Sequence, residues 1–173
     1  IESHQLPDPV VFLEHIGLYG LRGGLTGWGD NINQIVDTTA VQNRVSKGQL
    51  SIGEARILRG GRDITIVTWG AIVQKSIEAS KNTNYSADII DIRTLNPLDL
   101  ETIISSIKKT NRVIIAHEDN ITGGFGAEIV SKISDSAFEF LDAPIKRVAS
   151  KDSPVAYSSI LENEILVQTE WII

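Results

Sequence analysis

The chain has 173 residues, and its 22 acidic and 16 basic residues give a net charge of −6. This balance argues against nucleic acid or an anionic membrane as the main partner and permits a basic protein partner. The absence of cysteine excludes disulfides, thiolate catalysis and cysteine-bound metal. Apolar runs are too short to cross a bilayer and no targeting peptide is visible, so we expect a cytoplasmic protein, or a matrix protein in a mitochondrion.

The first 48 residues do not have the pattern of a complete domain. Pro9–Glu14 has the composition of a buried strand, with no helix before it. We therefore expect residues 1–20 to be the end of a preceding domain. Residues 21–48 are rich in Gly, Asn, Thr and Gln without periodicity, which predicts a long loop or linker between two domains. The missing methionine and the apolar ending at Glu170–Ile173, which is typical of the start of a helix, predict a fragment of a longer protein.

A regular alternation of strands and helices begins at Gln49 and defines a domain of residues 49–173. Gly60–Gly61 follows Arg56–Arg59 and is typical of a hairpin turn. Apolar runs and amphipathic patterns then predict, in order, strand Ile64–Trp69, helix Ala71–Ser80, strand Asp88–Ile92, a helix capped by Asp99, strand Val113–Ala116, helix Gly126–Leu141 and strand Ile145–Ala149. This spacing predicts an α/β fold of three layers, in which helices cover both faces of a mainly parallel sheet.

The polar residues His117, Glu118 and Asp119 end a predicted strand just before a glycine-rich turn. The carboxyl ends of parallel strands are where open α/β sheets usually place functional groups. However, consecutive side chains of a strand point to opposite faces, so Glu118 should point away from its two neighbours. A metal site or an acid–base pair needs convergent side chains, and we therefore favour structural roles for this trio.

The segment Thr122–Gly126 leads into a helix, whose free N–H groups are suited to binding phosphate. Its glycines match neither GxGxxG nor a P-loop with its lysine, and tight turning or close packing explains them equally well. Ser153 has no nucleophile elbow around it, and no two histidines are spaced for a metal. We assign no catalytic, cofactor-binding or metal-binding residue.

Six segments in order resemble a known family, the β subunits of thiamine-diphosphate-dependent 2-oxo acid dehydrogenases. These subunits belong to the decarboxylase components of the pyruvate and branched-chain complexes. The segments that carry the resemblance are Asp8–Tyr19, Gly53–Ala71, Asp91–Asp99, His117–Glu128, Leu141–Val148 and Asp152–Tyr157. The resemblance implies that residues 1–20 end the pyrimidine-binding domain and that residues 49–173 form the transketolase-like C-terminal domain.

The resemblance also implies which functions the chain lacks. In the family, the β-subunit residues that contact thiamine diphosphate lie upstream of the segments matched here, and the α subunit holds the diphosphate and Mg²⁺. We therefore expect this chain alone to bind no cofactor and to be inactive, although the complete enzyme uses both. The implied partners are an α subunit or fused α half, a second β subunit, and the peripheral-subunit-binding domain of the acyltransferase. The acidic docking contact of the family falls on Asp142, which a turn before Pro144 should leave at the surface.

The chain departs from the family at Ile16, where Lys or Arg is usual, and in its long Leu21–Gln49 connection. The Thr122–Gly126 segment favours the branched-chain enzymes slightly over the pyruvate enzymes. Two alternatives remain open. The first alternative to a 2-oxo acid dehydrogenase β subunit is the equivalent domain of a transketolase or deoxyxylulose-phosphate synthase. The second is a free-standing α/β module that binds a small molecule at Gly123–Gly126.

Overall fold

The structure is a computed structural model that describes residue 3, residues 6–18, the pairs 23–24 and 27–28, residues 39, 43 and 46, and residues 51–173. Most of the linker predicted over residues 21–48 lies outside the described residues. Its described part includes two short strands, β1 (Gly23–Gly24) and β2 (Gly27–Trp28), which pair antiparallel.

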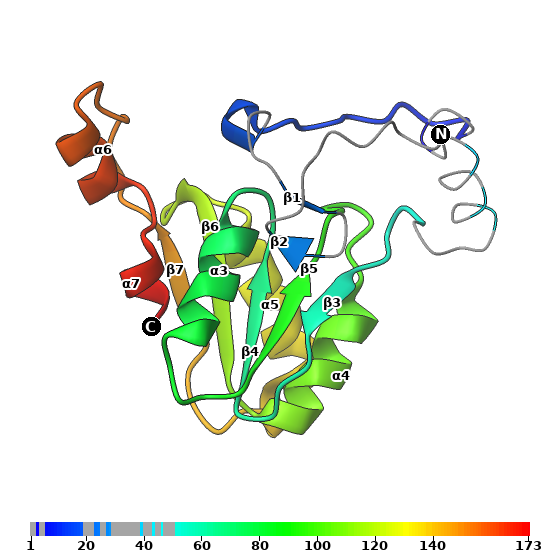
Figure 1. Ribbon diagram of the computed structural model, residues 1–173. Helices are drawn as coiled ribbons and strands as arrows, with labels where there is room; N and C mark the ends of the chain where they lie inside the picture. Colours follow the sequence, from blue (N-terminus) through cyan, green and yellow to red (C-terminus); the bar gives the residue numbers. More distant parts are fainter. Residues whose placement is uncertain are drawn as a thin grey trace.

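Five strands form the central sheet, in the spatial order β3-β5-β4-β6-β7 (Figure 1). Strands β4, β5, β6 and β7 are parallel, and β3 is an antiparallel edge strand beside β5. β4 consists entirely of β-branched residues, and Ile89–Ile90 in β5 and Val113–Ile115 in β6 continue this composition, as is usual where helices bury both faces of a parallel sheet. The bounds are Arg56–Arg59 (β3), Ile64–Thr68 (β4), Ala87–Asp91 (β5), Val113–Asn120 (β6) and Lys146–Ser150 (β7).

Helices cover both faces of this sheet, which confirms the three-layer α/β prediction (Figure 1). On one face, α4 (Leu100–Thr110) and α5 (Gly126–Ala137) bury a core that includes Ile103, Ile107, Ile129 and Ile133. On the other face, α3 (Ile72–Lys81) and α7 (Thr169–Ile172) pack against residues of β4, β5 and β6. Helix α6 (Ser159–Ile165) carries no buried residue and projects from the body.

Local sequence determines where two of the helices begin and end. Asp99 caps α4 as predicted, because its Oδ1 accepts a hydrogen bond of 3.0 Å from the Thr102 N–H. Asn111, in the left-handed conformation with φ of 60°, ends the same helix. The single helix predicted over Gly126–Leu141 is instead α5, ending at Ala137, followed by a 3₁₀ turn, η2 (Phe138–Phe140).

The hairpin predicted at Gly60–Gly61 is wrong. Strand β3 pairs with β5, and β5 lies between β3 and β4. Gly61 instead carries the chain across the start of β5, where a Cβ atom would lie 2.2 Å from the carbonyl carbon of Ala87. The glycine is therefore required by a close crossing of two backbones, which a hairpin of the same composition would not need.

The buried strand predicted at Pro9–Glu14 is also wrong for the described chain. Residues 9–15 form no strand, and Val11, Phe12 and Leu13 are exposed by 84%, 76% and 78%. A strand needs a neighbour to accept its hydrogen bonds, and no described strand lies beside this segment. A short 3₁₀ turn, η1 (Ile16–Leu18), follows it.

Candidate functional site

His117, which the sequence predicts at the end of a strand, lies at the same edge of the sheet as the residues that follow β4 and β5. Trp69 follows β4, Arg93 follows β5, and His117 lies near the end of β6, close to the turn that begins α5. This is the edge at which α/β sheets usually carry their sites.

His117 is completely buried, and its ring stacks on that of Trp69 with centroids 5.2 Å apart and planes 3° from parallel. Neither ring nitrogen has a hydrogen-bond partner among the described residues. Burial lowers the pKa of His117 because it penalises the charged imidazolium; Asp119 opposes this effect, and Arg147 reinforces it. The imidazole is thus held neutral in an aromatic environment.

The glycines of the turn are explained by this imidazole. A Cβ atom on Gly126 would lie 2.3 Å from His117 Nε2, and one on Gly124 would lie 2.8 Å from Cε1 of the same ring. Gly123 has a positive φ of 77°, which favours glycine in the turn itself. Tight turning at Gly123 and close packing at Gly124 and Gly126 therefore account for the glycines of Thr122–Gly126, as the sequence analysis offered in place of phosphate binding.

Glu118 diverges from His117, as predicted. Glu118 points towards the N-terminal segment, where both carboxylate oxygens lie 3.1 Å from His15 Nε2. Asp119 is exposed, and its Oδ1 accepts the N–H of Asn120 at 2.8 Å. The three side chains do not converge on one reacting atom.

Other acids near this edge have structural roles. Burial raises the pKa of Asp99, but hydrogen bonds from Ala55 and Thr102 outweigh burial and lower it overall. The hydroxyl and then the N–H of Thr122 lower the pKa of Asp152 by hydrogen bonding to its carboxylate. Both carboxylates therefore fix loops.

Asp91 is the one acid here whose pKa is raised, because burial outweighs the attraction of Arg93 and Arg56. Arg93 has a positive φ of 51°, and its N–H donates to Asp91 Oδ1 at 3.1 Å. Its guanidinium donates to the carbonyl oxygens of Ser51 and Glu54. This loop anchors the segment that precedes β3, and it leads into the cis Asn96–Pro97 bond.

Sequence reasoning missed a buried polar network at the opposite, amino-terminal edge. The Asp88 side chain is completely buried, Lys109 Nζ lies 2.5 Å from its Oδ2, and the Ser106 hydroxyl donates to the same oxygen. Thr65 Oγ1 lies 2.7 Å from Ser106 Oγ and 2.6 Å from Thr110 Oγ1. This network joins β4 and β5 to α4. In the sequence, the polar residues inside otherwise apolar runs could have indicated it.

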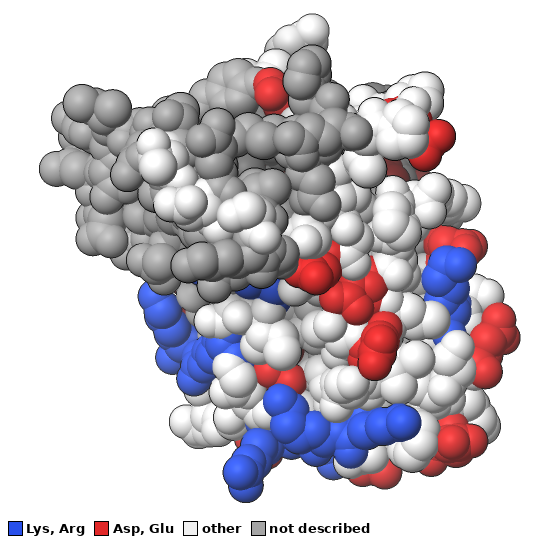
Figure 2. Space-filling model, turned by 90° about the vertical axis from the view of Figure 1, so that its right-hand side faces the viewer, with Lys and Arg blue, Asp and Glu red and all other residues white. Residues whose placement is uncertain are grey.

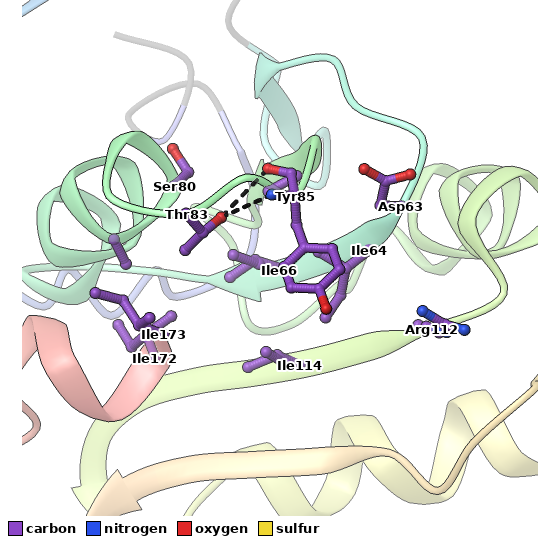
Figure 3. Close-up of a pocket in the computed structure, with 12 residues that line it drawn as sticks. Asp63, Ile64, Ile66, Ser80, Thr83, Tyr85, Arg112, Ile114, Ile172 and Ile173 are labelled. Atoms are coloured by element: carbon purple, nitrogen blue, oxygen red, sulfur yellow. Dashed lines mark hydrogen bonds between the residues drawn. The ribbon is translucent and has the colours of Figure 1, made fainter.

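A cavity of about 140 Å³ lies between the sheet and α3 and α7 (Figure 3). Ile64, Ile66 and Ile114 line it from the sheet, and Ile172 and Ile173 line it from the other side. Among the polar groups that line the cavity, the Thr83 hydroxyl is already hydrogen-bonded to the backbone of Tyr85. The cavity is mainly apolar and presents no convergent catalytic groups.

Asp142 lies at the amino-terminal edge, away from His117. Its carboxylate is exposed, as predicted, and its N–H donates to the Asn111 carbonyl oxygen at 2.8 Å. Within the described residues, no group of three or more His, Cys, Asp or Glu side chains is arranged to hold a metal ion. Every helix that these residues form is too short or too polar to cross a bilayer.

The sequence of the chain is similar to those of curated proteins that are β subunits of 2-oxo acid dehydrogenases. The β subunit of the mitochondrial pyruvate dehydrogenase E1 component of Dictyostelium discoideum is 37% identical over 169 residues, which are 96% of this chain and 44% of that protein. The β subunit of 2-oxoisovalerate dehydrogenase of Pseudomonas aeruginosa is 40% identical over 152 residues, or 87% of this chain and 43% of that protein. The chain thus spans less than half the length of these curated relatives.

A solved structure described as a split-gene transketolase, an inactive beta4 tetramer, shares the fold with a TM-score of 0.61 at 24% identity. The likeness covers 72% of this chain and 40% of that one. Residues 53–172 match the family model described as "Transketolase, C-terminal domain", which covers more than half of the chain. The chain therefore belongs to the transketolase C-terminal domain family.

Proposed function

We propose that the chain is the C-terminal part of the β subunit of a thiamine-diphosphate-dependent 2-oxo acid dehydrogenase and that it serves assembly and partner docking. The observation that carries this proposal is the extent of the similarity to such β subunits. It includes 96% of the chain and so continues into the residues before position 53, where the family model begins. The first alternative, the equivalent domain of a transketolase or deoxyxylulose-phosphate synthase, is supported by the family model over residues 53–172 and by a fold shared with a transketolase at 24% identity.

The carboxyl edge supports a structural role. His117 is enclosed by Trp69 and the glycine turn, and Glu118 diverges from it. The complete enzyme would oxidatively decarboxylate a 2-oxo acid and transfer the acyl group to lipoyl, with thiamine diphosphate and Mg²⁺ bound by other segments. The chain alone is then expected to bind neither and to be inactive.

Calorimetry tests this proposal directly. Titration of the chain with thiamine diphosphate and Mg²⁺ should give no binding heat, and a micromolar affinity would contradict the proposal. Titration with nucleotides examines the second alternative, a free-standing module at Gly123–Gly126. In the complete enzyme, His117→Ala should lower stability or assembly and leave single-turnover decarboxylation unchanged at equal oligomeric state.

The proposed partners are an α subunit or fused α half, a second β subunit, and the peripheral-subunit-binding domain of the acyltransferase. The exposed carboxylate of Asp142 supports the last of these, since a basic domain would meet it directly. Truncating one member of a desolvated charge pair costs about 2–5 kcal/mol. Asp142→Ala should therefore weaken docking and leave decarboxylation with an artificial electron acceptor intact, and added salt should weaken wild-type docking.

The substrate is proposed only as a 2-oxo acid. β Subunits of both pyruvate and 2-oxoisovalerate dehydrogenases are among the relatives. The slight preference for branched-chain substrates rests on Thr122–Gly126, whose glycines accommodate His117. It stays a prediction, and comparing turnover of both 2-oxo acids by the complete enzyme tests it.

A further inference from the structure

The cavity between the sheet and helices α3 and α7 has the size and lining of a site for a small aliphatic group. Its volume is about 140 Å³, and its apolar part is lined by Ile64, Ile66, Ala79, Ala87, Ile114, Ile172 and Ile173. Ile66, Ala79 and Ala87 are exposed by 4% or less, so the core itself forms this wall. An apolar cavity of about 150 Å³ stays dry and binds a molecule of about six carbon atoms. This cavity therefore has room for a compact aliphatic group.

Two charged side chains, those of Asp63 and Arg112, also line the cavity. These residues immediately precede the adjacent strands β4 and β6, where the Thr65 N–H donates to the Arg112 carbonyl oxygen at 2.8 Å. The Asp63 N–H donates to the Ser86 carbonyl oxygen at 2.9 Å, and the Ser86 N–H donates to Asp63 Oδ2 at 2.6 Å. Both side chains therefore start from backbone that is held in place at the amino-terminal edge of the sheet.

Neither of these charges is neutralised within the part of the chain that the structure describes. Asp63 and Arg112 are exposed, and they form no ion pair with each other or with another described residue. The hydroxyls of Ser80 and Thr83, by contrast, are already hydrogen-bonded to backbone groups. Figure 3 shows Arg112 at the opposite end of the cavity from Ile172. One positive and one negative group are thus left where an apolar cavity meets solvent.

We propose that this cavity binds an α-amino acid with a compact aliphatic side chain, such as that of leucine. The aliphatic side chain occupies the isoleucine-lined part, the carboxylate binds the Arg112 guanidinium, and the ammonium binds the Asp63 carboxylate. Arginine suits the carboxylate because its planar fork donates two parallel hydrogen bonds. The site lies at the edge of the sheet opposite His117, and the inference does not depend on the proposed function.

The charge around the site distinguishes this ligand from a simple carboxylate or amine. Helix α4, whose last turn carries Lys108 and Lys109, ends two residues before Arg112, and Figure 2 shows basic side chains gathered at this lower edge. Such a positive field attracts a carboxylate and repels an amine that carries no carboxylate. The field offers no partner to an ammonium group, so that partner has to be Asp63.

Isothermal titration calorimetry of the 173-residue chain with L-leucine tests the inference. Leucine should bind, whereas glycine, which has the same charged groups and no side chain, should bind about tenfold more weakly or less. 4-Methylpentanoate lacks only the ammonium of leucine, and 3-methylbutylamine lacks only the carboxylate. Each should bind about tenfold more weakly than leucine, because each loses one charged hydrogen-bonding group. This series uses the wild-type chain and does not depend on the folding of a variant.

Variants identify the two charged partners. Arg112→Gln should weaken leucine binding about tenfold and should not weaken binding of 3-methylbutylamine, which does not use Arg112. Asp63→Asn should weaken leucine binding to a similar degree and should not weaken binding of 4-methylpentanoate. Asparagine keeps an oxygen that accepts the Ser86 N–H, so the loop is retained. Arg62→Gln, at an exposed arginine outside the cavity lining, is the matched control and should leave leucine affinity unchanged.

Three results would overturn the inference. The first is the absence of binding heat with leucine at millimolar concentration. The second is an equal affinity for leucine and 4-methylpentanoate, which would remove Asp63 from the site and show that the ligand is a simple carboxylate. The third is an equal affinity for leucine and glycine, which would place the ligand outside the cavity. None of these results bears on the proposed dehydrogenase function, which the thiamine diphosphate titration tests separately.

Discussion

Replacing Gly126 by alanine should destabilise the protein because of His117. The added methyl group would lie 2.3 Å from Nε2 and 2.4 Å from Cδ2 of the imidazole. The ring has little freedom to shift, since it is completely buried and stacked on Trp69. Forcing extra volume into a packed core costs about 1–3 kcal/mol. Alanine in place of glycine within a helix otherwise gains up to about 1 kcal/mol, so the steric cost is the larger effect.

The cause is isolated by repeating the substitution in a His117→Ala background. There the methyl group meets no imidazole, and Gly126→Ala should become neutral or stabilising by up to about 1 kcal/mol. The coupling between the two positions should then be about 1–3 kcal/mol, measured by urea unfolding followed by circular dichroism. Gly60→Ala, where a Cβ atom meets nothing within 4 Å, is the control for the general effect of alanine. Equal costs of Gly126→Ala in both backgrounds would refute the proposed contact.

Three further predictions concern stability. Folding lowers the pKa of His117 from 6.5, so on acidification the unfolded chain takes up a proton at a higher pH than the folded chain. The free energy of unfolding should therefore fall as the pH drops below about 6.5, by at most about 1.4 kcal/mol per pH unit. Thermal unfolding of His117→Phe should lack this pH-dependent loss of stability, and a pH profile identical to that of the wild type would contradict the assignment. Asp99→Ala should cost about 0.5–2 kcal/mol through loss of the helix cap, measured by urea unfolding, whereas an unchanged midpoint would argue against the cap. Lys109→Met should destabilise the protein more than Asp88→Asn, by up to about 3 kcal/mol, because only Lys109→Met leaves the buried Asp88 carboxylate without its cation. If chemical unfolding showed Asp88→Asn to be the more destabilising change, other groups would have to compensate the Asp88 charge.

The regular part of the fold was predictable because its patterns are local. Strand β4 begins at Ile64 and α3 begins at Ile72, each within one residue of the predicted start. Asp99 was identified as a cap from its position before an apolar face, and its hydrogen bond to Thr102 confirms it. Burial on both sides of the parallel strands followed from their continuous apolar composition.

The errors arose where a partner distant in sequence decides the outcome. The glycine pair before β4 has the composition of a hairpin, yet β3 pairs with β5. Composition does not reveal that Gly61 crosses the start of β5 at close range. At the candidate site, alternation along the strand correctly separated Glu118 from His117. That Gly124 and Gly126 make space for His117 depends on the packing of α5 against β6, which no local pattern specifies.

The order of the strands has a consequence for synthesis on the ribosome. Strand β3 leaves the exit tunnel before β5, although β5 is the only neighbour with which it pairs in the described sheet. For the time it takes to translate the intervening residues, β3 is an unpaired strand in a growing chain. Its apolar residues Ile57 and Leu58 are flanked by Arg56 and Arg59, and such charges hinder nascent chains from pairing with one another. The same arginines then remain at the edge of the finished sheet.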